Sequence, residues 1–130
     1  MLSEKLARHF HQLARELPPV PAGVSWLNPL LEIPECGRVF RAFLDKYYGD
    51  EQPRQLILGI NPGRFGAGLT NVAFTDPAHL LRKCGIDSGF DKKEELSAKF
   101  IYIAIDEFGS VEQFYSRYFV NSVVPFGFVK

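Results

Sequence analysis

Hydrophobic positions recur at helical spacing in the first third of the chain. Residues 2–17 place five apolar side chains on one stripe, which predicts an amphipathic helix that ends at a run of prolines: Leu2, Leu6, Phe10, Leu13 and Leu17. Pro34 begins a second stretch of helical periodicity, which ends at Gly49. Between the two, residues 24–33 are apolar but interrupted by a proline, and this pattern favours a packed extended segment.

Two later segments have the pattern of buried strands. The apolar run in residues 54–60 is short and continuous, as expected of a central parallel strand covered on both faces, and residues 118–124 read as a second buried strand. Further helices are predicted between them. They begin at the Asp76–Pro77 pair, near Lys93 and at Ser110.

The order helix, helix, strand, helices, strand predicts the α/β class. We expect a three-layer αβα sandwich with a central parallel sheet. Because two strands make a poor sheet, we expect the sandwich to be truncated, with residues 1–130 forming the N-terminal part of a single domain.

Composition and charge exclude several classes of function. Fifteen Lys and Arg balance fifteen Asp and Glu, which argues against a broad electrostatic clamp on nucleic acid but allows a small footprint of backbone N–H groups on phosphates. Two thiols, Cys36 and Cys84, are too few for an iron–sulfur cluster, and their flanks lack zinc spacing. We therefore expect no metal and no cofactor, no membrane partner, and a monomer in the reducing cytoplasm.

A glycine-rich loop follows the first predicted strand. Residues 59–70 carry four glycines within ten positions, at the carboxyl end of a strand, where open α/β sheets bind ligands. The spacing fits neither the dinucleotide fingerprint nor the phosphate loop, because no Lys follows the glycines. A tight strand-to-helix connection explains the glycines equally well, so both interpretations stay open.

Asn121 and Phe74 are the other candidates for chemistry. Asn121 lies inside an apolar strand, and an unpaired buried amide costs about 1–3 kcal/mol. Its amide either satisfies a neighbouring backbone group or reads the edge of a planar ligand. Phe74 is either a core residue or a stacking platform.

These features occur together in a known enzyme family. The run Gly-Ile-Asn-Pro-Gly-Arg-Phe-Gly at residues 59–66, with Phe74 thirteen residues after Asn61, resembles the first motif of the single-strand-selective monofunctional uracil-DNA glycosylases. That motif is Gly-Met-Asn-Pro-Gly-Pro-Phe-Gly, with a Phe at the same spacing. Residues 119–128 are similar to the second motif, in which an Asn on a strand end precedes a Pro. The resemblance covers about residues 54–130 and is closest to a bacterial branch.

The resemblance implies a role for each matching residue. An enzyme of this family extrudes the target nucleotide from DNA and holds its base in a pocket. Phe74 would stack on the flipped uracil, Asn121 would pair with its Watson–Crick edge, and Asn61 would position the water that attacks C1′ of the sugar. The backbone at Pro62 and Gly63 would line the pocket near the base.

The chain departs from the family in two places. Arg64 replaces a proline of the first motif, where it either contacts a phosphate or lies in solvent. The third motif, a His-Pro-Ser-Pro-type loop whose His stabilises the departing uracil anion, is missing, and His9, His11 and His79 lie in other contexts. Loss of one such contact typically lowers a rate by about 10²–10³. We therefore expect this chain alone to be inactive, and its partners to be uracil-containing DNA and the missing C-terminal half of the domain.

Two other functions remain open at this point. One is a catalytically silent nucleic-acid or nucleotide-binding module that keeps the same pocket. The other is a nucleotide-binding domain unrelated to repair, whose glycine-rich loop would hold phosphate. The absence of a phosphate-loop Lys and the joint match of Asn61, Phe74 and Asn121 count against the second.

Overall fold

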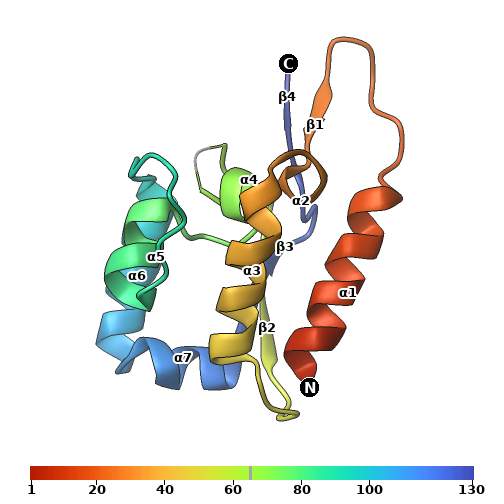
Figure 1. Ribbon diagram of the computed structural model, residues 1–130. Helices are drawn as coiled ribbons and strands as arrows, with labels where there is room; N and C mark the ends of the chain where they lie inside the picture. The colour runs from red at the N-terminus through yellow and green to blue at the C-terminus, as the bar shows by residue number, and fades with distance from the viewer. Residues whose placement is uncertain (65) are drawn as a thin grey trace.

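Helices and short strands alternate in the computed structural model, which describes residues 1–64 and 66–130 (Figure 1). The helices in these ranges are α1 (Leu2–Arg15), α2 (Pro29–Glu32), α3 (Pro34–Tyr47), α4 (Ala67–Thr70), α5 (Pro77–Cys84), α6 (Leu96–Phe108) and α7 (Val111–Arg117). The strands are β1 (Ser25–Leu27), β2 (Gln55–Gly59), β3 (Tyr118–Ser122) and β4 (Gly127–Val129). Each of the helices in the described ranges is too short or too polar to cross a lipid bilayer.

Two predicted helix starts, at Asp76 and Ser110, are confirmed by their caps, and the helix expected from near Lys93 begins at Leu96. The Asp76 side chain accepts a hydrogen bond from the backbone N–H of His79 at 2.8 Å, and Ser110 accepts one from the N–H of Gln113 at 3.1 Å. Both caps satisfy a backbone N–H that has no partner within its helix. Gly85 ends α5 in the left-handed region, with φ at +68°.

The α/β class is confirmed, with the sheet reduced to one parallel pair. β2 and β3 lie side by side in parallel, from Gln55 opposite Tyr118 to Gly59 opposite Ser122. This register brings the carboxyl ends of both strands to the same edge. The phenyl ring of Phe119 in β3 packs against Phe10 of α1 and Tyr48 after α3.

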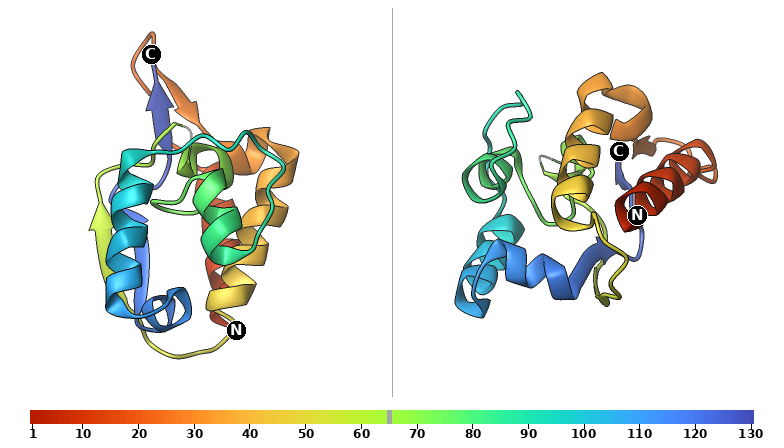
Figure 2. Two further views of the ribbon diagram at one scale, coloured as in Figure 1. Left: turned by 90° about the vertical axis from the view of Figure 1, so that its left-hand side faces the viewer. Right: turned by 60° about the horizontal axis from the view of Figure 1, so that its bottom comes forward.

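A second, antiparallel pair was not predicted. β1 pairs with β4, with Trp26 opposite Phe128, and the ribbon projects beyond the helices (Figures 1 and 2). The prediction of one extended segment over residues 24–33 is therefore wrong in part, because the short helix α2 follows β1. Its proline lies at the first position of α2, where its missing N–H costs nothing.

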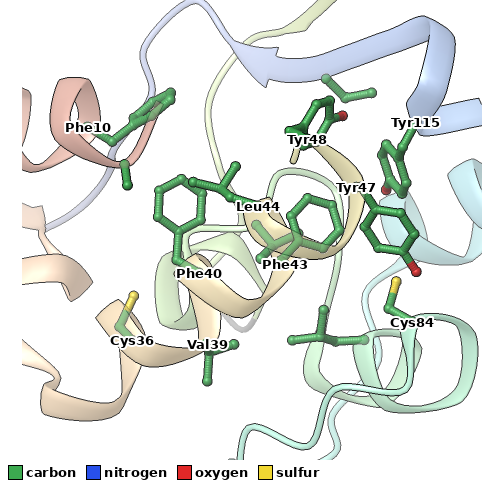
Figure 3. Close-up of a cluster of buried hydrophobic side chains, with 14 of the residues drawn as sticks. Phe10, Cys36, Val39, Phe40, Phe43, Leu44, Tyr47, Tyr48, Cys84 and Tyr115 are labelled. Carbon is green, nitrogen blue, oxygen red and sulfur yellow. The ribbon is translucent and has the colours of Figure 1, made fainter. Parts of the chain in front are cut away.

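The core is an aromatic layer between the helices. Phe40, Phe43 and Tyr47 of α3 point into it, and Phe10 approaches from α1 and Tyr115 from α7 (Figure 3). The rings meet edge-on or tilted, with centroids 5.1 Å apart for Phe43 and Tyr115 and 5.6 Å apart for Phe10 and Phe40. Such pairs add about 0.5–1.5 kcal/mol each beyond the apolar area they bury.

A buried guanidinium ties the start of the sheet to this core. Arg54 donates to the backbone oxygens of Tyr47 and Tyr115 at 3.1 and 2.7 Å, and it pairs with Asp50 at 3.0 Å. Its hydrogen bonds to Asp50 hold the pKa of that carboxyl below its ordinary value. The end of α3, the start of β2 and the end of α7 are therefore joined through one side chain.

The outer side of β2 is open. The sequence predicts a strand covered on both faces, but Leu56 and Leu58 are 60% and 52% exposed, and β2 lies at the margin of the molecule in the left view of Figure 2. The prediction of a strand covered on both faces is wrong for the described residues, because Leu56 and Leu58 on one face and Ile57 on the other are exposed. In these residues, β2 pairs with β3. The apolar composition of β2 is that of a central strand, whereas its position is that of an edge strand.

Both thiols are expected to resist alkylation at pH 8 in the folded chain. Cys36 and Cys84 are buried, and burial raises the pKa of the Cys36 thiol to about 12 and the pKa of Cys84 in the same direction. The thiolate is the reactive form, so iodoacetamide should modify both residues only after urea is added. Mass spectrometry of native and unfolded samples measures the difference.

Rapid native labelling of Cys36 at pH 8 would contradict the buried position. The raised pKa also has a consequence for stability. The contribution of the neutral Cys36 thiol to the free energy of unfolding is complete below the ordinary thiol pKa of 9.0. It is lost as the pH rises toward about 12.

Candidate functional site

A small pocket lies where β2 and β3 end. It encloses about 170 Å³, and its lining brings together the first motif, the loop before α5, the start of α6 and the end of β3: Asn61, Pro62, Gly63, Ala67, Phe74, Glu95, Ser97 and Ser122. Four of the five residues predicted from the sequence therefore meet here. The position is the carboxyl edge of the parallel pair, where α/β folds place ligands.

Backbone hydrogen bonds fix the beginning of the first motif to the segment that follows β3. Beyond the two strands, the ladder continues with hydrogen bonds from Val123 N to Gly59 O at 2.9 Å and from Val124 N to Ile60 O at 3.1 Å. Asn61 follows directly, and its side-chain amide donates to the carbonyl of Pro62 at 3.3 Å. The amide of Asn61 is exposed at the pocket, so a water molecule or a ligand reaches it.

Phe74 is held in an unusual backbone conformation. Its φ is +53°, which is rare for an aromatic residue and marks a position fixed by its surroundings. The ring packs directly on Gly59, since a Cβ at Gly59 would lie 2.0 Å from Cζ of Phe74. The next residue, Thr75, is buried and shares a hydrogen bond with the hydroxyl of Tyr102 at 2.9 Å. Gly59 is therefore required because the ring occupies the space of a side chain.

Asn121 does not line this pocket. It lines a separate groove beside α1, together with His9 and Phe10, and its Oδ1 accepts a hydrogen bond from the N–H of Ser122 at 2.7 Å. The next residue, Ser122, lines both this groove and the pocket. The pocket lining does not include Asn121, so its pairing with the edge of a base stays a prediction.

Glu95 is the residue that the sequence analysis missed. It is the carboxylate in the pocket lining, and its backbone N–H donates to Oδ2 of Asp76 at 2.8 Å. Neither residue stands in a motif, and they are nineteen positions apart in the chain, so no local pattern connects them.

The buried side chain of His79 contacts Asp76 and does not line the pocket. Its Nδ1 lies 2.8 Å from Oδ1 of Asp76, and its ring stacks on Tyr102 with centroids 5.3 Å apart. His9 and His11 lie on α1, also outside the pocket lining.

Neither Cys36 nor Cys84 lies in the pocket lining. Burial raises the pKa of both thiols, which disfavours their reactive form. Within residues 1–64 and 66–130, no three His, Cys, Asp or Glu side chains gather closely enough to hold a metal ion. What the pocket offers instead is an aromatic ring, an amide, a hydroxyl and a carboxylate around exposed backbone. This set suits a flat, polar ring such as a nucleobase.

Comparison with known proteins finds a similar solved structure. No protein-family model and no curated protein matches the chain. The crystal structure of Pedobacter heparinus SMUG2 is similar over 98% of this chain, with 40% sequence identity and a TM-score of 0.86. This chain spans 54% of the length of SMUG2, about half.

Replacing Gly59 with alanine is expected to destabilise the protein by about 1–3 kcal/mol, because the new methyl group and the Phe74 ring require the same space. Urea unfolding measures the effect. The matched control is Gly37→Ala in α3, where the nearest atom to a new Cβ is 3.8 Å away. That change should leave stability the same or raise it by up to about 1 kcal/mol. Equal unfolding midpoints for the two variants would contradict the packing of Phe74 on Gly59.

Proposed function

From the confirmed likeness of this chain to a bacterial single-strand-selective monofunctional uracil-DNA glycosylase, we propose that it provides part of the active site of a DNA repair enzyme. The enzyme would hydrolyse the N-glycosidic bond of uracil, or of a related damaged pyrimidine, in DNA. The observation that carries the proposal is the meeting of Asn61, Gly63 and Phe74 in one pocket at the carboxyl edge of the sheet. These residues belong to the motif whose spacing resembles that of the family.

Different residues of the pocket would contact the face and the edge of the base. A glycosylase turns its target nucleotide out of the DNA stack and into a closed site. The half-buried ring of Phe74 is the stacking platform, and stacking of this kind contributes about 1–3 kcal/mol per base. The exposed backbone at Pro62 and Gly63 lies along the base, and the hydroxyl of Ser122 both donates and accepts hydrogen bonds.

Asn61 positions the attacking water. Its side-chain oxygen accepts a hydrogen bond from the water and directs the water oxygen toward C1′ of the sugar. The C1′–N bond breaks, its electron pair leaves with the base, and the new C1′–O bond forms as the water loses a proton to solvent. Hydrolysis through an oxocarbenium-like state needs a placed water more than a strong base. No covalent intermediate with a lysine is involved, as in a monofunctional enzyme.

A second part of the domain would complete the enzyme. Apolar side chains that normally lie inside a protein are exposed along β2 and on one stripe of α6, a surface that we call the open face: Leu56, Leu58, Ile60, Leu96, Phe100 and Ile103. SMUG2 is about twice as long as this chain, so it contains enough further polypeptide to cover such a face. We propose that the remaining half of the domain pairs with β2, packs on α6 and supplies the group that stabilises the departing base anion.

A catalytically silent binding module is the alternative function. It would use the same ring and backbone to recognise a base without breaking the bond. The two functions differ in one measurable respect, the release of free uracil.

The complete gene product is expected to release uracil from a single-stranded oligonucleotide, and Asn61→Ala is expected to slow the release by about 10²–10³ because the water loses its orientation. The matched control is Gln12→Ala, which removes an exposed side-chain amide on α1 outside the pocket lining and should change the rate by less than about tenfold. Single-turnover kinetics with a chromatographic assay for free uracil measure both.

Two results would count against the proposal in different ways. Oligonucleotide binding without any release by the wild type would favour the silent module. Equal losses in Gln12→Ala and Asn61→Ala would contradict the role of Asn61 in the pocket.

The open face is tested by adding the remaining half of the domain as a separate chain. Phe100→Glu should weaken capture of that half by at least tenfold, because Phe100 is 70% exposed here and would be buried in the complex. Lys99→Glu adds the same side chain one position away and serves as the control. Calorimetric titration measures the affinities, and equal binding by both variants would show that α6 is not part of the contact.

A further inference from the structure

The carboxylate of Glu95 lies against the glycines of the first motif. A Cβ at Gly63 would lie 2.3 Å from Oε2 and 2.6 Å from Oε1 of Glu95, and a Cβ at Gly66 would lie 3.0 Å from Oε2. Real Cβ atoms essentially never come closer than 3.0 Å, so a side chain at Gly63 would displace the carboxylate, and one at Gly66 would be in tight contact with it. It bridges the beginning and the end of the turn that follows Asn61.

The two glycines are needed for this contact rather than for their backbone conformation. Neither is among the glycines of the described residues that have positive φ, and Gly66 has φ at −115°. A side chain at Gly63 therefore meets the carboxylate of Glu95, and one at Gly66 meets both that carboxylate and the backbone carbonyl of Thr75 at 3.0 Å. The glycine pattern that marks the first motif and the distant Glu95 form one packing unit.

Glu95 is itself held by a buried anchor. Asp76 has no exposed surface, and its two oxygens serve different segments. Oδ1 accepts from the backbone N–H of His79 at 2.8 Å, and Oδ2 accepts from the backbone N–H of Glu95 at 2.8 Å. The start of α6 is thereby fixed to the start of α5, and the side chain of Glu95 leaves this fixed point toward the pocket.

We infer that Glu95 is a positioning residue, which holds the turn after Asn61 in place through its contacts with Gly63 and Gly66. The inference rests on the proposed function, since the group it positions is the Asn61 amide that orients water. A displacement of about 1 Å at such a group costs on the order of 10²-fold in rate, even when the change lies away from the reacting atoms.

The experiment compares Glu95→Ala, Glu95→Gln and Glu94→Ala in the complete gene product. Glu95→Ala empties the space against the glycines, and single-turnover uracil release should fall by about 10²-fold. Glu95→Gln keeps the volume and one acceptor oxygen and should retain the rate within about tenfold. Glu94→Ala removes a neighbouring carboxylate that pairs with Arg82 and Lys99 outside the pocket, and it should have little effect.

A double variant makes the test independent of overall stability. Gly63→Ala should impair the wild-type background strongly, because its methyl group meets the carboxylate. The same change should cost little more in the Glu95→Ala background, where the space is vacant, so the two effects are not additive. Additive losses would overturn the inference, as would full activity of Glu95→Ala. A loss in Glu95→Gln as large as that in Glu95→Ala would also overturn it, since charge and not position would then matter.

Hydrogen exchange separates failure of this inference from failure of the proposed function. The N–H of Gly68 donates to the carbonyl of Gly63 at 2.8 Å, so its exchange rate reports on the turn without any catalysis. Faster exchange of the Gly68 amide in Glu95→Ala than in Glu94→Ala supports the positioning role, even if the wild type releases no uracil. Equal exchange in the two variants contradicts it, even if the wild type is active.

Discussion

One buried carboxylate fixes the relative positions of the segments that form the pocket. Asp76 receives N–H groups from the first turn of α5 and from the residue that begins α6, and the imidazole of His79 lies against the same oxygen. A buried charge is costly unless it is fully hydrogen-bonded, so each of these partners is needed for the others to stay in place. Phe74 lies two residues before this anchor, and Glu95 extends from it. The ring of Phe74 and the carboxylate of Glu95 are therefore placed by the same interaction.

The parallel pair supplies the other half of the geometry. The register that sets Gly59 opposite Ser122 makes the two strands end together, so that the first motif and the end of β3 border one small space. Within it, the absence of side chains is as important as their presence. Gly59 leaves room for the ring of Phe74, and Gly63 and Gly66 leave room for Glu95. The glycine-rich connection after β2 is therefore a packing surface for the side chains of Phe74 and Glu95, which come from later segments of the chain.

The sequence predicted what depends on local periodicity and capping. The α1 and α3 stripes, the caps at Asp76 and Ser110 and the two parallel strands were all found from patterns within a few residues. β1 and β4 were missed because each has three residues, and their pairing joins segments about a hundred positions apart. Such a contact leaves no signal in either segment alone.

The same limit applied to the candidate site. The motif located Asn61, Pro62, Gly63 and Phe74 in one pocket, but it did not tell which face of β3 turns toward them. Ser122 lies in the pocket lining and Asn121 does not, so the role expected of Asn121 toward the base stays a prediction. Glu95 could not be predicted for a different reason. Its contact with Gly63 joins residues that are distant in the sequence and forms only when α6 packs near the loop.

The open side of β2 has a consequence for how a complete domain assembles. The aromatic core between α1, α3 and α7 is buried without any contribution from beyond β2, so this unit has most of what it needs to form first. A strand that joins β2 in parallel must return through a crossover connection, and this long-range pairing is slower than the local packing that precedes it. Without the proposed strand, the unpaired edge of β2 is a template for any extended segment, including β2 of another molecule. Addition of the proposed strand would then compete with self-association, which becomes faster as the protein concentration rises.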